Sequence, residues 1–183
     1  NCLWRRQYNR MLTMSHAKNK LDWCLKKAEK ELEEQGKHRG LIVIKPDKKQ
    51  ALEHIKKAEH NLKGGIDFAK MGYSDWSASA FFYSMYQCFL AIAAKFGYES
   101  GNQECTFALI ESLIEDNKIN LDKNLLDKVA SLEFQKEKET STSTEIREEY
   151  QYGTKLSINE NLYKELLELS QKILSQTKEI IEE

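Results

Sequence analysis

Apolar residues recur every three to four positions along most of this chain, which is the spacing of amphipathic helices. The first such segment runs from His16 to Gly36, and the glycine is expected to end the helix. A second helix is predicted after Pro46, with Asp47 as its N-cap. Its apolar face contains Leu52, Ile55, Ala58, Leu62, Ile66 and Ala69.

Two adjacent glycines, Gly64 and Gly65, lie inside the predicted second helix. Each costs about 1 kcal/mol of helix stability relative to alanine. A glycine pair in the middle of a helix therefore indicates either a kink or the close approach of a neighbouring helix.

The segment from Ser74 to Gly97, SDWSASAFFYSMYQCFLAIAAKFG, is apolar around nearly its whole circumference. This predicts a third helix that is buried on several sides. Ser74 or Asp75 is expected to cap it, and it should end near Phe96. Its alanines allow close helix contacts, and its bulk comes from Phe81, Phe82, Tyr83, Tyr86 and Phe89.

Three further helices complete the pattern. Asn102 is expected to cap a fourth helix that ends near Asp116, and Asp122 to start a fifth. After a polar stretch rich in Ser and Thr, which predicts a loop, Ser157 to Glu160 has the form of a capping box. The last helix has the apolar seam Leu162, Leu166, Leu169, Ile173 and Ile180. The predicted fold is therefore all-α, an up-and-down bundle of five or six helices.

Composition agrees with this class of fold. Of the 183 residues 40% are hydrophobic and 31% charged, with a single proline, which argues against a β-sandwich or barrel. The formal net charge of −1 gives no overall attraction to nucleic acid or an anionic membrane. No uncharged apolar run reaches the roughly 18 residues that a membrane span needs, so no membrane association is expected.

The cysteine pattern predicts neither a metal site nor a cofactor. The four cysteines show no C-x-x-C pair, and no His/Cys spacing fits zinc. Cys88, in the most apolar segment, is interpreted as a small buried hydrophobe. Without a recognisable signal peptide, the expectation is a reduced, cytoplasmic protein.

Three parts of the chain can be distinguished. Residues 1–14 lack a helical period and are predicted to be a disordered or non-native extension, because Met14-Ser15 looks like a natural start. Residues 15–46 form an N-terminal helix and loop, and residues 47–183 the helical bundle.

Two segments together resemble the HEPN family of small helical-bundle proteins. They are AEHNLKGGIDFAKMGYSDWSASAFFYSMYQCFLAIAAKFGYES and, before the last helix, IREEYQYGT. The resemblance covers the chain from about Asp47 onward and implies a HEPN-like bundle that forms a homodimer. It also implies RNA or a nucleotide as ligand, a toxin–antitoxin or defence context, and a minimal nucleotidyltransferase as partner protein.

RNA-cleaving members of that family carry an arginine followed four to six residues later by a histidine. Two copies meet across a dimer cleft and cleave RNA without a metal, leaving a 2′,3′-cyclic phosphate. Here Arg147 matches the arginine, but Tyr152 lies in the histidine window. A tyrosine with its ordinary pKa of about 10 is a poor base at neutral pH. The usual nuclease activity is therefore not expected.

The residues around this element remain candidates for binding. Arg147, Tyr150 and Tyr152 are the predicted ligand-binding residues, and Arg147 with Tyr152 is the candidate pair for any remaining catalysis. The alternative is structural: Arg147 pairs with a carboxylate, and the tyrosines pack in the core or a dimer seam. His38 and Arg39 form a second candidate, a basic anion-binding loop, unless their charge simply suits a helix C-terminus.

Other candidates have simpler interpretations. His54 and His60 are read as solvated helix residues, and Trp76, Tyr83 and Tyr86, which could stack on bases, as core. A basic stripe would form if the first two helices lay together, but glutamates interrupt it. Its lysines are Lys26, Lys27, Lys30, Lys56, Lys57 and Lys63.

Three functional hypotheses follow. The first is a dimeric module that binds a nucleotide, RNA or a partner protein. The second is a metal-independent endoribonuclease toxin that uses Arg147, with Tyr152 or a neighbour's His38. The third is a structural subunit of a protein complex.

Overall fold

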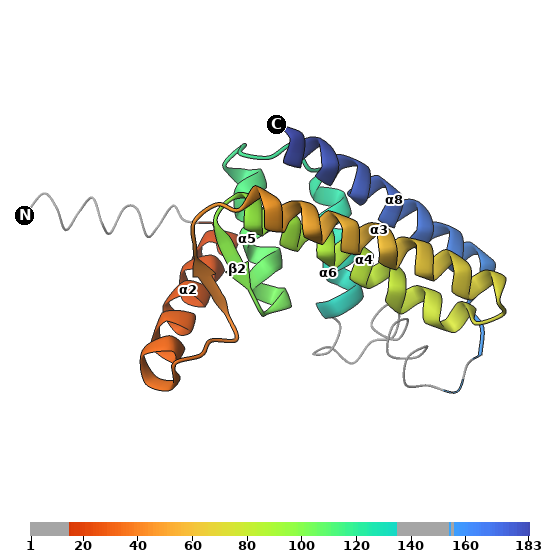
Figure 1. The fold of residues 1–183 in the computed structure, drawn as a ribbon, viewed down its shortest axis with the longest axis horizontal. Helices are drawn as coiled ribbons and strands as arrows, with labels where there is room; N and C mark the ends of the chain where they lie inside the picture. The colour runs from red at the N-terminus through yellow and green to blue at the C-terminus, as the bar shows by residue number, and fades with distance from the viewer. Residues whose placement is uncertain (1–14, 135–153, 155) are drawn as a thin grey trace, which may run out of the picture.

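The computed structural model describes residues 15–134, 154 and 156–183. These residues form an all-α helical bundle with one two-stranded antiparallel sheet (Figure 1). The helices are α2 (His16–Gln35), α3 (Lys48–Lys70), α4 (Ser74–Lys95), α5 (Gln103–Glu115), α6 (Lys123–Phe134) and α8 (Glu160–Glu182). The strands are β1 (Leu41–Val43) and β2 (Tyr98–Ser100). The predicted fold class is confirmed. The predicted N-terminal extension and the Ser/Thr-rich loop lie outside the described residues.

Most of the predicted helix ends are correct. Gly36 follows α2 with a φ of 64°, the left-handed conformation that glycine adopts readily. The side chain of Asp47 accepts a hydrogen bond from the Gln50 N–H at 2.9 Å. Asn102 does the same for the Cys105 N–H at 2.9 Å. Each side chain satisfies a donor that the first turn leaves unpaired.

Two predicted caps are wrong. α4 begins at Ser74 itself, and the side chain of Ser74 accepts a hydrogen bond from the Ile158 N–H at 3.1 Å. α8 begins at Glu160 and is capped by Asn159, whose side chain accepts from the Asn161 N–H at 2.8 Å. At α8 a neighbouring polar residue caps the helix in place of the expected one, whereas the N-cap of α4 is Tyr73, with no side-chain cap hydrogen bond.

α3 and α4 pack as an antiparallel hairpin along a seam of small residues. On α3 the seam is Ala51, Ala58 and Gly65, and on α4 it is Ser77, Ser84 and Ala91; all six are buried. Both sets recur every seven residues and therefore stay on one helix face. Two hydrogen bonds cross the seam, from Ser77 Oγ to the Gly65 carbonyl at 2.7 Å and from Ser84 Oγ to the Ala58 carbonyl at 2.8 Å.

Gly65 marks the tightest point of this seam. A Cβ atom at Gly65 would lie 2.5 Å from the ring of Phe81 on α4, whereas one at Gly64 would have no neighbour within 4 Å. Of the two interpretations of the glycine pair, the close approach of a neighbouring helix is therefore correct, and it applies to Gly65.

α8 covers a second side of α4. Ile173, Ile180 and Ile181 of α8 are buried in the main core, and Leu166 joins Phe81 in a smaller cluster. α4 is long and apolar enough to cross a membrane, but 78% of its most apolar window is buried inside the protein. Burial among its neighbours accounts for this apolar character. Cys88, on the same helix, is buried as predicted.

The N-terminal segment packs at one end of the bundle. β1 pairs with β2, so that Leu41 lies opposite Ser100, and α2 packs against α5 and β1 (Figure 1). A disulfide joins Cys24 of α2 to Cys105 of α5, with the two Cα atoms 5.8 Å apart. The expectation of a reduced protein is therefore wrong for this pair. The bond could not be predicted from the sequence, because the two cysteines are 81 residues apart and have no diagnostic spacing.

The glycine pair offers a matched test of the seam. We expect Gly65→Ala to lower the free energy of unfolding by about 1–3 kcal/mol, because the buried Phe81 ring must move to admit the methyl group. Gly64→Ala should leave stability unchanged or raise it by up to about 1 kcal/mol, the difference in helix propensity. Urea denaturation of both variants measures this. Equal stabilities would contradict the seam.

Candidate functional site

Three of the five predicted site residues, Arg147, Tyr150 and Tyr152, lie outside the described residues. The described chain resumes at Thr154 and leads into α8. This lead-in is held at one end of the bundle, where Ile158 donates its N–H to Ser74 at the start of α4. Ile158 also packs in a small cluster with Ala78, Phe81 and Leu166.

The other two predicted site residues, His38 and Arg39, lie at the opposite end of α4. His38 is nearly buried, with its Nε2 3.6 Å from a carboxylate oxygen of Glu99. The backbone N–H of Arg39 donates to a carboxylate oxygen of Glu31 at 2.9 Å. Two carboxylates thus contact this basic loop, and they disfavour an anion there. The geometry favours the structural interpretation of this loop over the anion-binding one.

His38 is therefore well separated from the lead-in to α8. α4 has 22 residues, which correspond to about 33 Å of helix. Ser74 lies at its first turn, whereas Glu99, the partner of His38, follows its last turn (Figure 1). Within one chain, the described residues do not bring His38 to the point where the chain enters α8.

The prediction that His54 and His60 are both solvated helix residues is wrong for His54. His54 is not a free surface residue: its Nδ1 lies 2.7 Å from the side-chain oxygen of Gln87 on α4. His60 is exposed, as predicted. The hydrogen bond adds His54 to the α3–α4 interface.

The predicted core position of Trp76 is also wrong. Trp76 is 54% exposed and Tyr83 is 38% exposed. Tyr86 is half-buried as expected, with its ring stacked on Phe82 and its hydroxyl 3.2 Å from Thr106 Oγ1. A helix with apolar residues on every side can therefore still expose some of them to solvent.

Trp76 is one of four large apolar or aromatic residues that are exposed at or beside the α3–α4 turn. We call this group the turn cap; it consists of Phe68, Met71, Tyr73 and Trp76, which are 39%, 68%, 55% and 54% exposed. The backbone beneath it is fixed by hydrogen bonds such as Tyr73 N–H to the Phe68 carbonyl at 2.8 Å. Leu156, 81% exposed, precedes the Ile158 contact at the same end.

Charges beside the turn cap neutralise one another. The carboxylate of Asp67 pairs with Lys63, and its other oxygen lies 3.8 Å from Lys70. The hydrogen bond from Lys63 holds the pKa of Asp67 below its usual value. The turn cap is therefore an aromatic and apolar surface with little net charge at its edge.

The lysine stripe does not form along two joined helices. α2 packs against α5 and β1, away from the outer face of α3. Lys26, Lys30 and Lys63 each pair with a carboxylate four residues away on their own helix. Such exposed pairs are typical of an ordinary solvated surface.

The described residues hold no group of three or more His, Cys, Asp or Glu side chains that could bind a metal. Cys24 and Cys105 are joined in the disulfide, and burial raises the pKa of the Cys88 thiol to about 12. An apolar hollow of about 290 Å³ lies between α2 and β1, lined by Leu25, Glu29, Leu32, Ile42 and Val43. It carries a single titratable group, which suits apolar contact better than catalysis.

Comparison with known proteins does not assign the chain to a group. No protein-family model matches it, and no curated protein matches it.

Proposed function

We propose that this protein is a HEPN-like homodimeric binding module for RNA or a nucleotide, acting in a defence or toxin–antitoxin system without histidine-dependent cleavage. The observation that carries the proposal is the turn cap. Four large apolar or aromatic side chains are exposed together on a rigid helix hairpin, beside the point where the chain enters α8.

The chemistry of the turn cap suits a protein interface. Aromatic residues and methionine are enriched at the centres of such interfaces, and charged residues are depleted there. Surfaces of this kind seldom remain uncovered in a working protein. A second copy of the chain is the partner that the family resemblance implies, and an isologous contact lets one patch serve both subunits.

The position of the turn cap agrees with a shared ligand site. Arg147 precedes Ile158 by eleven residues, which span at most roughly 40 Å. Pairing through the turn cap would therefore keep both copies of the element around Arg147 within reach of one interface. An arginine there can bind a phosphate through two parallel hydrogen bonds.

The same geometry argues against the endoribonuclease hypothesis. A guanidinium can neutralise the phosphate, but a second group must take the proton from the 2′-hydroxyl. His38, the histidine proposed for that role, is nearly buried beside Glu99 at the far end of α4. Binding without cleavage is what the remaining residues support.

A substitution that introduces a charge into the turn cap tests the dimer. We expect Met71→Asp to raise the dimer dissociation constant at least roughly tenfold, because a carboxylate loses its water in an apolar interface. Val43→Asp is the matched control: Val43 is also 68% exposed but lies on β1 at the other end. Sedimentation equilibrium at micromolar concentration measures both. A monomeric wild type, or equal weakening by both variants, would refute the interface.

Ligand binding is tested separately with single-stranded RNA. We expect the wild type to bind a labelled RNA oligonucleotide in fluorescence anisotropy, more weakly as salt rises. Arg147→Ala should weaken binding, and Arg147→Lys should restore part of it, because the charge returns without the paired hydrogen bonds.

The same samples, incubated without metal, should leave the RNA intact. Fragments made by the wild type and not by Arg147→Ala would establish the endoribonuclease instead. A wild type that forms the dimer but binds neither RNA nor nucleotide would leave the structural-subunit hypothesis.

A further inference from the structure

α2 is attached to the bundle mainly by small residues and surface charges. Its buried residues are Ala17, Cys24 and Ala28, while Leu21 and Leu25 are half-buried against the core. Such small side chains bury little apolar area, so this helix gains less from packing than α3, α4 or α8.

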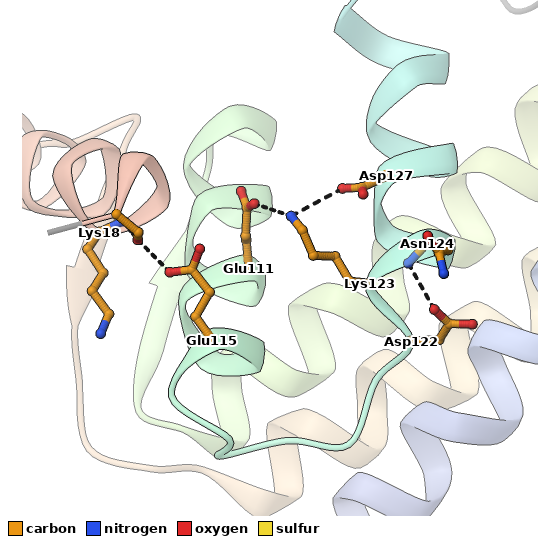
Figure 2. Close-up of polar contacts among 8 residues, drawn as sticks. Lys18, Glu111, Glu115, Asp122, Lys123, Asn124 and Asp127 are labelled. Atoms are coloured by element: carbon orange, nitrogen blue, oxygen red, sulfur yellow. Dashed lines mark hydrogen bonds and ion pairs between the residues drawn. The ribbon is translucent and has the colours of Figure 1, made fainter. Parts of the chain in front are cut away.

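The polar contacts of α2 are on the surface. Lys20 pairs with Glu104 at 2.7 Å, Lys18 pairs with Asp116, and Ser15 bonds to Glu115. Figure 2 shows this side of the molecule, including the Lys123 bridge from Glu111 to Asp127 that ties α5 to α6 rather than to α2. Exposed ion pairs of this kind contribute only about 0–1 kcal/mol each.

The disulfide is therefore the strongest single link between α2 and the rest of the protein. Cys24 is fully buried and Cys105 is 3% exposed. Gly40, just before β1, closes over this region: a Cβ atom there would lie 3.0 Å from Ala28 Cβ and 3.5 Å from the Cys24 carbonyl oxygen. Because both half-cystines are buried, a reductant reaches the sulfurs only when the packing around them opens.

α2 contributes little to the main core. The large buried side chains of that cluster come from α3, α4, α5, α6, α8, β1 and the α5–α6 connection, and α2 contributes Cys24 as its only fully buried member. Release of α2 would leave the α3–α4 seam and the contact between α4 and α8 intact. We therefore expect that α2 can detach without unfolding the bundle.

We propose that the Cys24–Cys105 disulfide is a redox latch that holds α2 against α5 and β1, and that its reduction releases α2 while the bundle stays folded. The reductant is a dithiol. Thiol–disulfide exchange breaks the Cys24–Cys105 bond, two electrons and two protons pass to form two cysteine thiols, and the dithiol becomes a disulfide.

Release of α2 would change one surface of the molecule. The apolar hollow between α2 and β1 would open, exposing Ile42 to solvent or to a partner. Cys88 takes no part, because it is a free, buried cysteine of α4 and the bond joins Cys24 to Cys105. The turn cap lies at the opposite end, so the latch is independent of the proposed dimer.

Hydrogen exchange of the full-length protein, oxidised and dithiothreitol-reduced, tests the latch. Reduction should speed amide exchange in residues 16–35 at least roughly tenfold and leave α4 and α8 protected. Cys24→Ser with Cys105→Ser should behave like the reduced protein under both conditions. Cys88→Ser should behave like the wild type.

Three results would overturn the latch: no Cys24–Cys105 peptide in a non-reducing digest of the oxidised protein, equal protection of α2 in both states, or loss of protection in every helix on reduction. Loss of protection in every helix would mean that the disulfide stabilises the whole fold and not α2 alone. Sedimentation of the same samples separates the two proposals, because the dimer should persist after reduction whether or not α2 is released.

Discussion

The close approach of α3 and α4 is the constraint on which the rest of the structure depends. Two helices can lie this near only if the facing positions carry small side chains, and both supply one every seven residues. The serines Ser77 and Ser84 then reach the carbonyls across the seam. Because each serine hydroxyl donates to a helix carbonyl, its burial leaves no unpaired donor.

This seam determines where the large side chains go. Phe81 sits over Gly65 on the α3 side and contacts Tyr163 of α8, with ring centroids 5.5 Å apart. One aromatic ring thus joins all three long helices. Once the seam and the α8 face of α4 are filled, Trp76 has no described element left to cover it. The turn cap is therefore a consequence of the hairpin geometry, and its exposure leaves it available for contact with another molecule.

How far the sequence could predict this structure depends on the range of each interaction. Local signals worked: Gly36, Asp47 and Asn102 act at helix ends within a few residues. Long-range contacts were not predictable. Ser74 bonds to Ile158, which is 84 positions away, and is the first residue of α4 instead of its N-cap. The disulfide and the His54–Gln87 hydrogen bond could not be predicted for the same reason, because each forms only after two helices have been placed side by side.

One signal was present in the sequence and could have been used. The spacing of Ala51, Ala58 and Gly65 matches that of Ser77, Ser84 and Ala91, so the α3–α4 register could be inferred from small residues alone. The candidate site offers no such pattern. Exposure of Trp76 depends on which helices are absent around it, and periodicity within α4 reports only how apolar the helix is.

The two ends of the bundle have different physical characters, and this bears on function. At the turn cap, rigid aromatic side chains stand beside neutralised charges, a combination that favours lasting contact with another surface. At the other end, α2 has few large buried side chains and depends on one covalent bond. Because the α3–α4 seam separates these ends by the length of a helix, a change in the oxidation of one need not disturb binding at the other. The proposed latch at one end and the proposed dimer interface at the other are therefore compatible with each other.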